Sequence, residues 1–499
     1  MPKLPILLLL ISTLLFCASK EEALLASLDP HSISQHLAFY ELYAETAQGR
    51  TALEHAWKLL RGEAGKELIA FPQLSNQALI SLVTRQPFEP PVTLSQEHLH
   101  IVTTLSAFLS NRSLKGFRVC SKEELLSLHS EEIDLGRALL LNQFETLEEI
   151  YQYEASLDLM ALQILAHLSK TPSDEEKIKE INRFIFQEMQ FRFPPHSLYA
   201  KDIDLYTFLP SVLDNRQGVC LGVSILYLCL AQRLNLPLEI ITPPGHIYVR
   251  YRKGEEVINI ETTARGINLP SEVYLGINTR TLQQRSLKEV VGMAFFNQAS
   301  VFWGKEEYTK TVELYEKALC YLPDDPLLNL FLGLNYLFVG KKTEGKKVLN
   351  TLKNITFDYA VSPETMPSDY LNGKVDIEGL KIIFLPVDET RSSILDKQRK
   401  LKKVLTKYPH FRAGLMQLAT TYMQLGRSQE ALDTLETYHL IDPNDASVEY
   451  YLAMLCLTRL DYRKAWSHLK QAEKLTSQRE HHPKALTALR HELRSVCPN

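Results

Sequence analysis

Apolar residues recur at three- and four-residue spacing along most of the chain, and this spacing predicts a mainly helical protein. Residues 31–60 and 131–168 show the pattern most regularly. The turn-rich segment FEPPVTLSQEH separates these two stretches. We therefore expect a helical region over residues 20–170. Nothing in this region points to chemistry, so its pattern supports packing or interaction alone.

The pattern changes between residues 171 and 290. Ser173 and the acidic residues after it form a helix start, and a long apolar helix follows that Asn235 and Pro237 end. Three segments with strand-like composition come next, namely LEIIT, HIYVRY and EVINIE. Helices followed by strands predict an α+β domain over residues 171–290.

From residue 291 onward the helices become repetitive, with a period of about 34 residues, as in tetratricopeptide (TPR) repeats. The phase is lost over residues 358–391, although Pro409 and Pro443 lie one period apart. We therefore expect TPR repeats over residues 291–357 and 392–499, separated by an irregular insertion, with a degenerate unit near Pro409. The residues that carry the repeat are Phe302, Tyr315, Ala318, Pro323, Leu332, Gly333, Tyr336, Leu418, Ala419, Tyr422, Ala431, Leu435, Pro443, Leu452, Ala453, Ala465 and Leu469.

The N-terminus carries an almost uninterrupted apolar run from Leu4 to Phe16. This run is too short to span a bilayer comfortably, yet it suits the apolar part of a signal peptide. The small residues at 17–19 suit cleavage before Lys20, and Cys17 is an alternative lipidation site. We expect an exported protein with a signal peptide over residues 1–19, periplasmic or associated with the cell envelope. An uncleaved anchor or a buried helix is the alternative.

Composition narrows the possible partners. The net charge is −4, so the overall charge does not favour binding to nucleic acid. The only membrane contact that we expect is a lipid anchor at Cys17. The basic segment KQRKLKK fits a solvated helix face better than a nucleic-acid contact. Seven cysteines lie far apart, with no CxxC pair, so we expect neither a zinc module nor a cofactor. Cys229, Cys320 and Cys456 lie among apolar residues, which predicts that they are small core side chains.

Cys220 is the cysteine that stands apart. It follows Gly218-Val219 and opens the apolar helix, so it is expected at or near a helix N-terminus. The unpaired backbone N–H groups and the helix dipole favour an anion there, and a thiolate is the form of cysteine that attacks acyl groups. Asn215 or Gln217 could supply an amide donor beside it.

A predicted hairpin brings a histidine and a carboxylate together. His246 begins the strand HIYVRY, and EVINIE is the returning strand that ends before Glu261. If Lys253-Gly254 forms a two-residue loop, His246 stands directly opposite Glu261, with Cβ atoms about 4.5–5.5 Å apart. A thiol from the neighbouring helix then completes a Cys-His-acid set.

Each of these residues also has a structural interpretation. Cys220 could be a core cysteine, His246 a structural histidine at a strand end, and Glu261 a surface charge. The catalytic interpretation is favoured because the helix start and the hairpin geometry agree with each other.

The order G-V-C on a helix, then P-G-H on a strand, then an acid followed by two threonines resembles the transglutaminase-like superfamily, which has a papain-like core. The stretch YTFLPSVLDNRQGVCLGVSILYLCLAQRLNLPLEIITPPGHIYVRY resembles its SirB-like bacterial branch, most specifically at Leu236-Pro237 and Pro244-Gly245-His246. The resemblance covers roughly residues 147–340. It implies Cys220 as nucleophile, His246 as general base and acid, and Glu261 where the superfamily has Asp. Many members of this branch lack the cysteine.

Two functions follow from these features. The first is an exported cysteine-dependent amide hydrolase or acyltransferase with a TPR surface that binds a protein or peptide. The second is a scaffold protein, in which a degenerate transglutaminase-like core supports a partner-binding solenoid.

Overall fold

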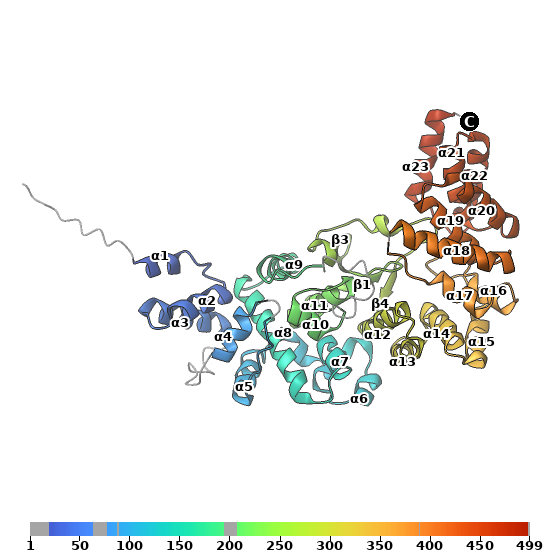
Figure 1. Cartoon of the computed structure of the whole chain (residues 1–499). Helices are drawn as coiled ribbons and strands as arrows, with labels where there is room; N and C mark the ends of the chain where they lie inside the picture. Colours follow the sequence, from blue (N-terminus) through green and yellow to red (C-terminus); the bar gives the residue numbers. More distant parts are fainter. Residues whose placement is uncertain (1–18, 63–76, 87–88, 194–206, 389, 498–499) are drawn as a thin grey trace, which may run out of the picture. The chain divides into compact units, whose positions relative to one another are not determined.

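The computed structural model describes residues 19–62, 77–86, 89–193, 207–388 and 390–497, and it divides into two compact units (Figure 1). Residues up to Phe108, together with Ala155–Glu176, form the first unit. Leu109–Glu154 and everything from Lys177 onward form the second. The predicted signal peptide lies outside the described residues except for its last residue, Ser19. No helix of the described residues is both long and apolar enough to cross a membrane.

The first unit is helical throughout its described part. It contains α1 (Lys20–Ala26), α2 (Ile33–Tyr43), α3 (Ala47–Arg61), α4 (Gln77–Thr84), α5 (Gln96–Leu105) and the second half of α8 (Leu147–His167). Ser32, Thr46 and Ser95 cap three of these helices by accepting a backbone N–H. Their apolar faces meet in one core around Trp57 and Leu159.

The second unit begins with short helical turns and a small α+β core. After α6 (Lys122–Ser127) and α7 (Leu135–Leu141) come α9 (Asp174–Arg183), the π-helix η4 (Phe184–Glu188), α10 (Leu209–Asn215) and α11 (Cys220–Arg233). All residues of α11 except Cys220 and Gln232 are buried, as expected of a helix that is apolar on every side. It packs against a four-stranded antiparallel sheet.

The sheet has the strand order β3-β2-β1-β4. Its strands are β1 (Glu239–Thr242), β2 (Tyr248–Lys253), β3 (Glu256–Ile260) and β4 (Gln283–Arg285). The predicted segments LEIIT and EVINIE contain β1 and β3, and HIYVRY covers β2 up to Tyr251, two residues before the strand ends. Strand β4 was not predicted, because its residues Gln-Gln-Arg have no apolar alternation.

The predicted hairpin forms, but two details of the prediction are wrong. Strand β2 begins at Tyr248, so His246 lies two residues before it. Lys253 pairs with Glu256, which makes Gly254-Glu255 the loop in place of Lys253-Gly254. Gly254 has a φ of +60°, which a two-residue hairpin turn of type II′ requires at its first loop position. The register is therefore shifted by two residues, and this even shift leaves every side chain on its predicted face.

The remainder of the second unit is a series of antiparallel helix pairs. These are α12 (Leu287–Gly304) with α13 (Tyr308–Leu319), α14 (Pro326–Phe338) with α15 (Lys342–Thr351), α19 (Arg412–Gln424) with α20 (Ser428–Ile441), and α21 (Ala446–Thr458) with α22 (Tyr462–Ser477). The last helix is α23 (Lys484–Val496). The fully buried alanines Ala431 of α20 and Ala465 of α22 lie one period of 34 residues apart and allow close helix contact at equivalent positions of two pairs.

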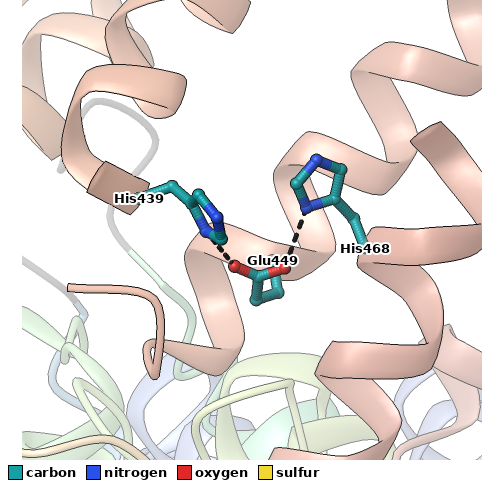
Figure 2. Close-up of side chains that lie close together, drawn as sticks. All are labelled: His439, Glu449 and His468. Atoms are coloured by element: carbon teal, nitrogen blue, oxygen red, sulfur yellow. Dashed lines mark hydrogen bonds and ion pairs between the residues drawn. The ribbon is translucent and has the colours of Figure 1, made fainter. Parts of the chain in front are cut away.

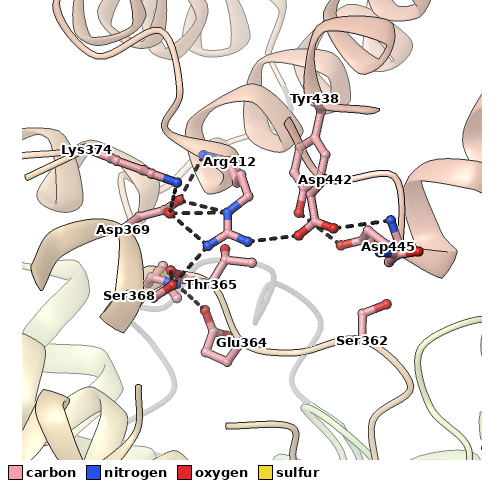
Figure 3. A network of polar contacts seen from close by, with 12 residues as sticks. Ser362, Glu364, Thr365, Ser368, Asp369, Lys374, Arg412, Tyr438, Asp442 and Asp445 are labelled. Atoms are coloured by element: carbon pink, nitrogen blue, oxygen red, sulfur yellow. Dashed lines mark hydrogen bonds and ion pairs between the residues drawn. The ribbon is translucent and has the colours of Figure 1, made fainter. Parts of the chain in front are cut away.

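The stretch where the repeat loses its phase contains two short helices, α16 (Met366–Leu371) and α17 (Ile377–Ile383), and the longer α18 (Arg391–Lys407) follows it. Figure 3 shows how Arg412 ties α16 to α19. Its guanidinium binds the fully buried carboxylate of Asp369 at 2.8 Å and that of Asp442 at 2.8 Å. The Arg412 backbone N–H also donates to Asp369 at 3.1 Å.

We expect Asp369→Ala to lower the stability of the repeat region by about 3 kcal/mol, because it leaves a half-buried guanidinium without its main partner. Lys374→Ala is the matched control, since its ammonium lies 3.6 Å from the same carboxylate but is 36% exposed. The control should cost less than about 1 kcal/mol. Urea unfolding followed by circular dichroism measures both, and equal shifts in the two variants would contradict the assignment.

Candidate active site

Cys220 is the first residue of α11. Val219 before it is extended and provides no side-chain cap, so the first-turn N–H groups of the helix are left for other acceptors. Gly218 fixes the approach to the helix by donating its N–H to Arg192 O at 3.2 Å. A side chain at Gly218 would meet Val223 Cγ2 at 2.6 Å. The thiol of Cys220 is therefore held, half-buried, at a positive helix end.

A tight turn positions His246. The His246 N–H donates to Pro243 O at 3.0 Å, with Pro244 and Gly245 as the central residues. Gly245 has a φ of +74°. Proline followed by a glycine with positive φ is the sequence that a type II turn requires. The turn formed by Pro243, Pro244 and Gly245 thus fixes the position of the His246 imidazole relative to the sheet.

Glu261 is a buried carboxylate in which both oxygens accept hydrogen bonds. Its Oε2 accepts His246 Nε2 at 2.7 Å and the hydroxyl of Tyr274. Its Oε1 accepts the Thr263 N–H at 3.1 Å and the Thr263 hydroxyl at 2.6 Å. By extrapolation of the observed register, Glu261 lies opposite Tyr248, so it reaches His246 along a diagonal. Diagonal neighbours on a sheet face are about 7–8 Å apart, which suits the longer side chain of glutamate.

Residues behind the site join the hairpin to α11. The hydroxyls of Ser224 and Thr262 lie 3.0 Å apart, and Thr262 also lies within 3.5 Å of Cys220 O. On the other side, the Tyr274 ring stacks on His246 at 5.5 Å and on Tyr248 at 5.0 Å. The imidazole is therefore fixed in position by both a carboxylate and an aromatic ring.

The charges of His246 and Glu261 stabilise each other. Burial alone would lower the pKa of His246, but hydrogen bonds with Cys220 and Glu261 outweigh burial and raise this pKa to about 9. Burial would raise the pKa of Glu261, but its bonds from His246, Thr263 and Tyr274 lower that pKa to about 2. Nε2 of His246 binds Glu261, so Nδ1 is the ring nitrogen left to face Cys220. At neutral pH this arrangement places an imidazolium between the carboxylate of Glu261 and the sulfur of Cys220.

A cavity of about 360 Å³ opens beside Cys220 and His246. The residues of the core contribute one part of its wall, and the first repeat helices contribute the other. On the core side it is lined by Leu221, Thr242, Pro243, Ile247 and Arg285, and on the repeat side by Met293, Phe296, Asn297, Leu327 and Phe331. Because most of these side chains are apolar, the cavity suits an apolar portion of a substrate.

The structure thus brings the three predicted site residues together, with His246 as the link. The side-chain amide of Asn215 donates to Ser211 O at 2.8 Å within its own helix, so this donor is already occupied. The side chain of Gln217, the other predicted amide donor, is buried. Tyr274 was missed, because the segment around it shows no periodicity that would place it near Glu261.

The other cysteines fit the prediction in part. Cys229 is fully buried, which raises the pKa of its thiol, and Cys456 is also buried. Cys320 is exposed, which corrects the expectation of a core side chain. It is the C-cap residue of α13 and follows the exposed Glu316 and Lys317 by four and three residues, which puts it on the solvent side at the end of this helix.

Comparison with known proteins agrees with this architecture. Residues 151–295 match the family described as the transglutaminase-like superfamily, and residues 398–455 match the tetratricopeptide repeat. The chain contains a transglutaminase-like domain and TPR repeats. The predicted fold class, an α+β transglutaminase-like core followed by a TPR α-solenoid, is confirmed.

The chain is similar to two curated proteins of Xylella fastidiosa. A UPF0162 protein of strain Temecula1 is 24% identical over 223 residues, which is 41% of this chain and 75% of the relative. That of strain 9a5c is 22% identical over 221 residues, with the same coverage.

Among solved structures, a thermophilic TPR protein of Thermus thermophilus is 19% identical with a TM-score of 0.21, covering 41% of this chain and 97% of its own. A TPR protein of Parabacteroides merdae is 15% identical with a TM-score of 0.23, covering 40% and 70%.

Glu261→Gln should lower the pKa of His246 from about 9 toward its ordinary value of 6.5, because it removes the negative charge beside the ring. A raised histidine pKa adds stability that is complete below pH 6.5 and is lost as the pH rises through about 9. The variant should therefore lose less stability over this interval than the unmodified chain. NMR titration of the histidine ring protons measures the pKa itself.

Glu239→Gln is the matched control, because Glu239 pairs with Arg250 on the same sheet. It should leave the titration of His246 unchanged. A His246 that titrates near pH 6.5 in the unmodified chain would contradict the ion pair.

Proposed function

We propose that the transglutaminase-like domain is a cysteine-dependent amide hydrolase or acyltransferase with Cys220 as its nucleophile. The observation that carries this proposal is the position of His246, which lines one cavity with Cys220 and is held through Nε2 by the buried Glu261. A nucleophile, a base within reach and a third group that orients the base are what nucleophilic catalysis needs.

The reaction follows from these contacts. The Cys220 thiolate attacks the carbonyl carbon of an amide, and the first-turn N–H groups of α11 are the nearest candidates to stabilise the negative oxygen. The His246 imidazolium gives its proton to the leaving nitrogen as the C–N bond breaks, which leaves a thioester. Water or an amine then attacks the thioester, His246 accepts its proton, and the thiolate departs. Glu261 stays ionised throughout and stabilises the imidazolium.

We further propose that the substrate lies between the core and the first repeat helices. Support comes from the cavity beside Cys220, whose wall includes Met293 and Phe296 of α12 and Phe331 of α14. Arg285 and Asp325, which form a 2.7 Å ion pair, also line it. The repeat region, which TPR proteins use to bind peptides or partner helices, then helps to select the protein substrate.

We also propose that the domain lies in the SirB-like branch of the superfamily. The Pro244-Gly245-His246 element supports this placement, because it forms the turn that positions the imidazole. Members that lack the cysteine cannot use this chemistry, so the alternative for this chain is a scaffold with an inactive core. The two functions differ in the reactivity of Cys220.

Cys220 should react with iodoacetamide near neutral pH much faster than Cys120 or Cys320. These two thiols are exposed, but we propose no histidine as a base for either of them. His246→Ala should slow this labelling, and Glu261→Gln should slow it less. Mass spectrometry of tryptic peptides at several reaction times gives each rate. Equal and slow labelling of all three cysteines would favour the scaffold.

In single-turnover assays on a library of peptide amides, Cys220→Ser should abolish acyl transfer while leaving the fold intact. His246→Ala should reduce the rate by roughly a hundredfold to ten-thousandfold, the usual contribution of a general acid–base. Glu261→Gln should reduce it less, since a hydrogen bond to the ring remains possible. Activity that survives Cys220→Ser would refute the proposed nucleophile.

Leu327→Trp tests the cavity, because it adds bulk to the wall that α14 contributes. It should slow turnover of peptide amides at least tenfold and leave labelling of Cys220 by the small iodoacetamide nearly unchanged. Leu440→Trp is a control, since Leu440 is 85% exposed and lies outside this lining. Equal turnover in the two variants would place the substrate elsewhere.

Export is a further proposal, and it rests on the apolar run from Leu4 to Phe16. We expect the mature chain to begin near Lys20 or at a lipidated Cys17. Mass analysis of the N-terminus from the native host checks this, and an intact Met1 in a cytosolic fraction would contradict it.

A further inference from the structure

Three side chains from successive helices of the repeat region meet around one buried carboxylate. Glu449 of α21 is 1% exposed, and its two oxygens each contact an imidazole (Figure 2). Oε1 lies 2.5 Å from Nδ1 of His439 on α20, and Oε2 lies 2.9 Å from Nδ1 of His468 on α22. One candidate ligand atom from each of the three residues lies within 4.8 Å of those from the other two.

The repeat itself does not require polar residues at these positions. The equivalent positions of the preceding repeat lie about 34 residues earlier in the chain. Leu415 stands there in place of Glu449, Leu405 in place of His439, and Thr434 in place of His468. Leu415 is buried in its repeat, as a core position of a helix pair demands. The carboxylate of Glu449 thus replaces an apolar side chain inside a packed core.

Such a replacement is costly unless positive charge compensates it. An ionised carboxylate loses several kcal/mol of hydration on burial, and this loss must be offset by a cation close by. Two imidazoles and one carboxylate that converge on one point offer two ways to do this. One imidazole can hold an extra proton, or a divalent cation can bind all three groups.

We propose that His439, Glu449 and His468 form a zinc-binding site in the TPR region. Two histidines and one glutamate are a common protein ligand set for Zn²⁺, and Nδ1 is an accepted donor atom. Tetrahedral coordination with bonds of about 2.0–2.2 Å separates ligand atoms by roughly 3.3 Å, so ligand atoms that lie within 4.8 Å of one another need to move relative to each other by no more than about 1.5 Å.

The exposure of the site gives the metal an entry path and a fourth ligand. The His439 side chain is 33% exposed and that of His468 is 15% exposed, whereas Glu449 is buried behind them. Zn²⁺ therefore takes a water molecule as its fourth ligand from the solvent side. Because the ligands come from α20, α21 and α22, the bound metal joins one repeat to the next.

The test uses the full chain carrying Cys220→Ser, which removes the thiol beside His246 as a competing zinc ligand. Isothermal titration with Zn²⁺ should show one saturable equivalent, and excess Zn²⁺ should raise the thermal unfolding midpoint by a few degrees. His468→Ala should weaken Zn²⁺ binding at least about tenfold. His491→Ala, which removes an exposed histidine on α23, should bind like the parent.

Glu449→Leu is the most informative variant, because it restores the residue found at Leu415 of the preceding repeat. It should fold with the same helical circular dichroism and no lower midpoint without metal, yet lose the Zn²⁺-dependent rise. No saturable binding by the parent would overturn the proposal and leave the cluster as an ion pair only. Equal Zn²⁺ affinity in the parent and Glu449→Leu would overturn it as well.

Discussion

The buried carboxylate of Glu261 is the constraint from which the rest of the candidate active site follows. It is 3% exposed, so its charge must be met by donors inside the protein. The structure meets it with Thr263 on one oxygen and with His246 and Tyr274 on the other. The same contacts fix the ring of His246, which leaves its second nitrogen for Cys220. The contacts that stabilise the buried charge of Glu261 are therefore the same contacts that orient the base, His246.

The second unit contains other buried carboxylates that are bound to a cationic side chain. Glu154 is buried against the guanidinium of Arg137 at 2.6 Å, and Asp369 is buried against Arg412 at 2.8 Å. In these two pairs the cation is arginine, which keeps its charge at all ordinary pH values. At Glu261 the cation is a histidine, whose proton can move. This difference separates a structural ion pair from a site that can perform acid–base chemistry.

Much of this organisation could be predicted from the sequence, because periodicity and turn residues act locally. Helical spacing predicted the repeat region, and Cys220 was correctly placed at a helix start. The hairpin was predicted with the wrong loop, since Lys253-Gly254 and Gly254-Glu255 are both compatible with glycine in the turn. The error was an even number of residues, so His246 and Glu261 stayed on one face and their contact survived it.

What the sequence could not show depends on contacts between distant segments. Tyr274 reaches Glu261 from a segment with no regular spacing, and the strand β4 has no apolar alternation. Cys320 was misplaced because its neighbours in sequence are apolar, whereas its own position at the C-cap of α13 faces solvent. The cavity wall formed by α12 and α14 arises only when the repeats pack on the core.

The central claim is that Cys220 is a nucleophile activated by His246. Its most direct test is to mix the protein with a small activated acyl donor, such as a nitrophenyl ester, and to follow the intact mass in rapidly quenched samples. We expect an adduct equal to one acyl group, located on the peptide that contains Cys220, which forms and then decays as water attacks the thioester. An acyl group that never appears on Cys220 in the folded protein would show that this thiol is not an activated nucleophile.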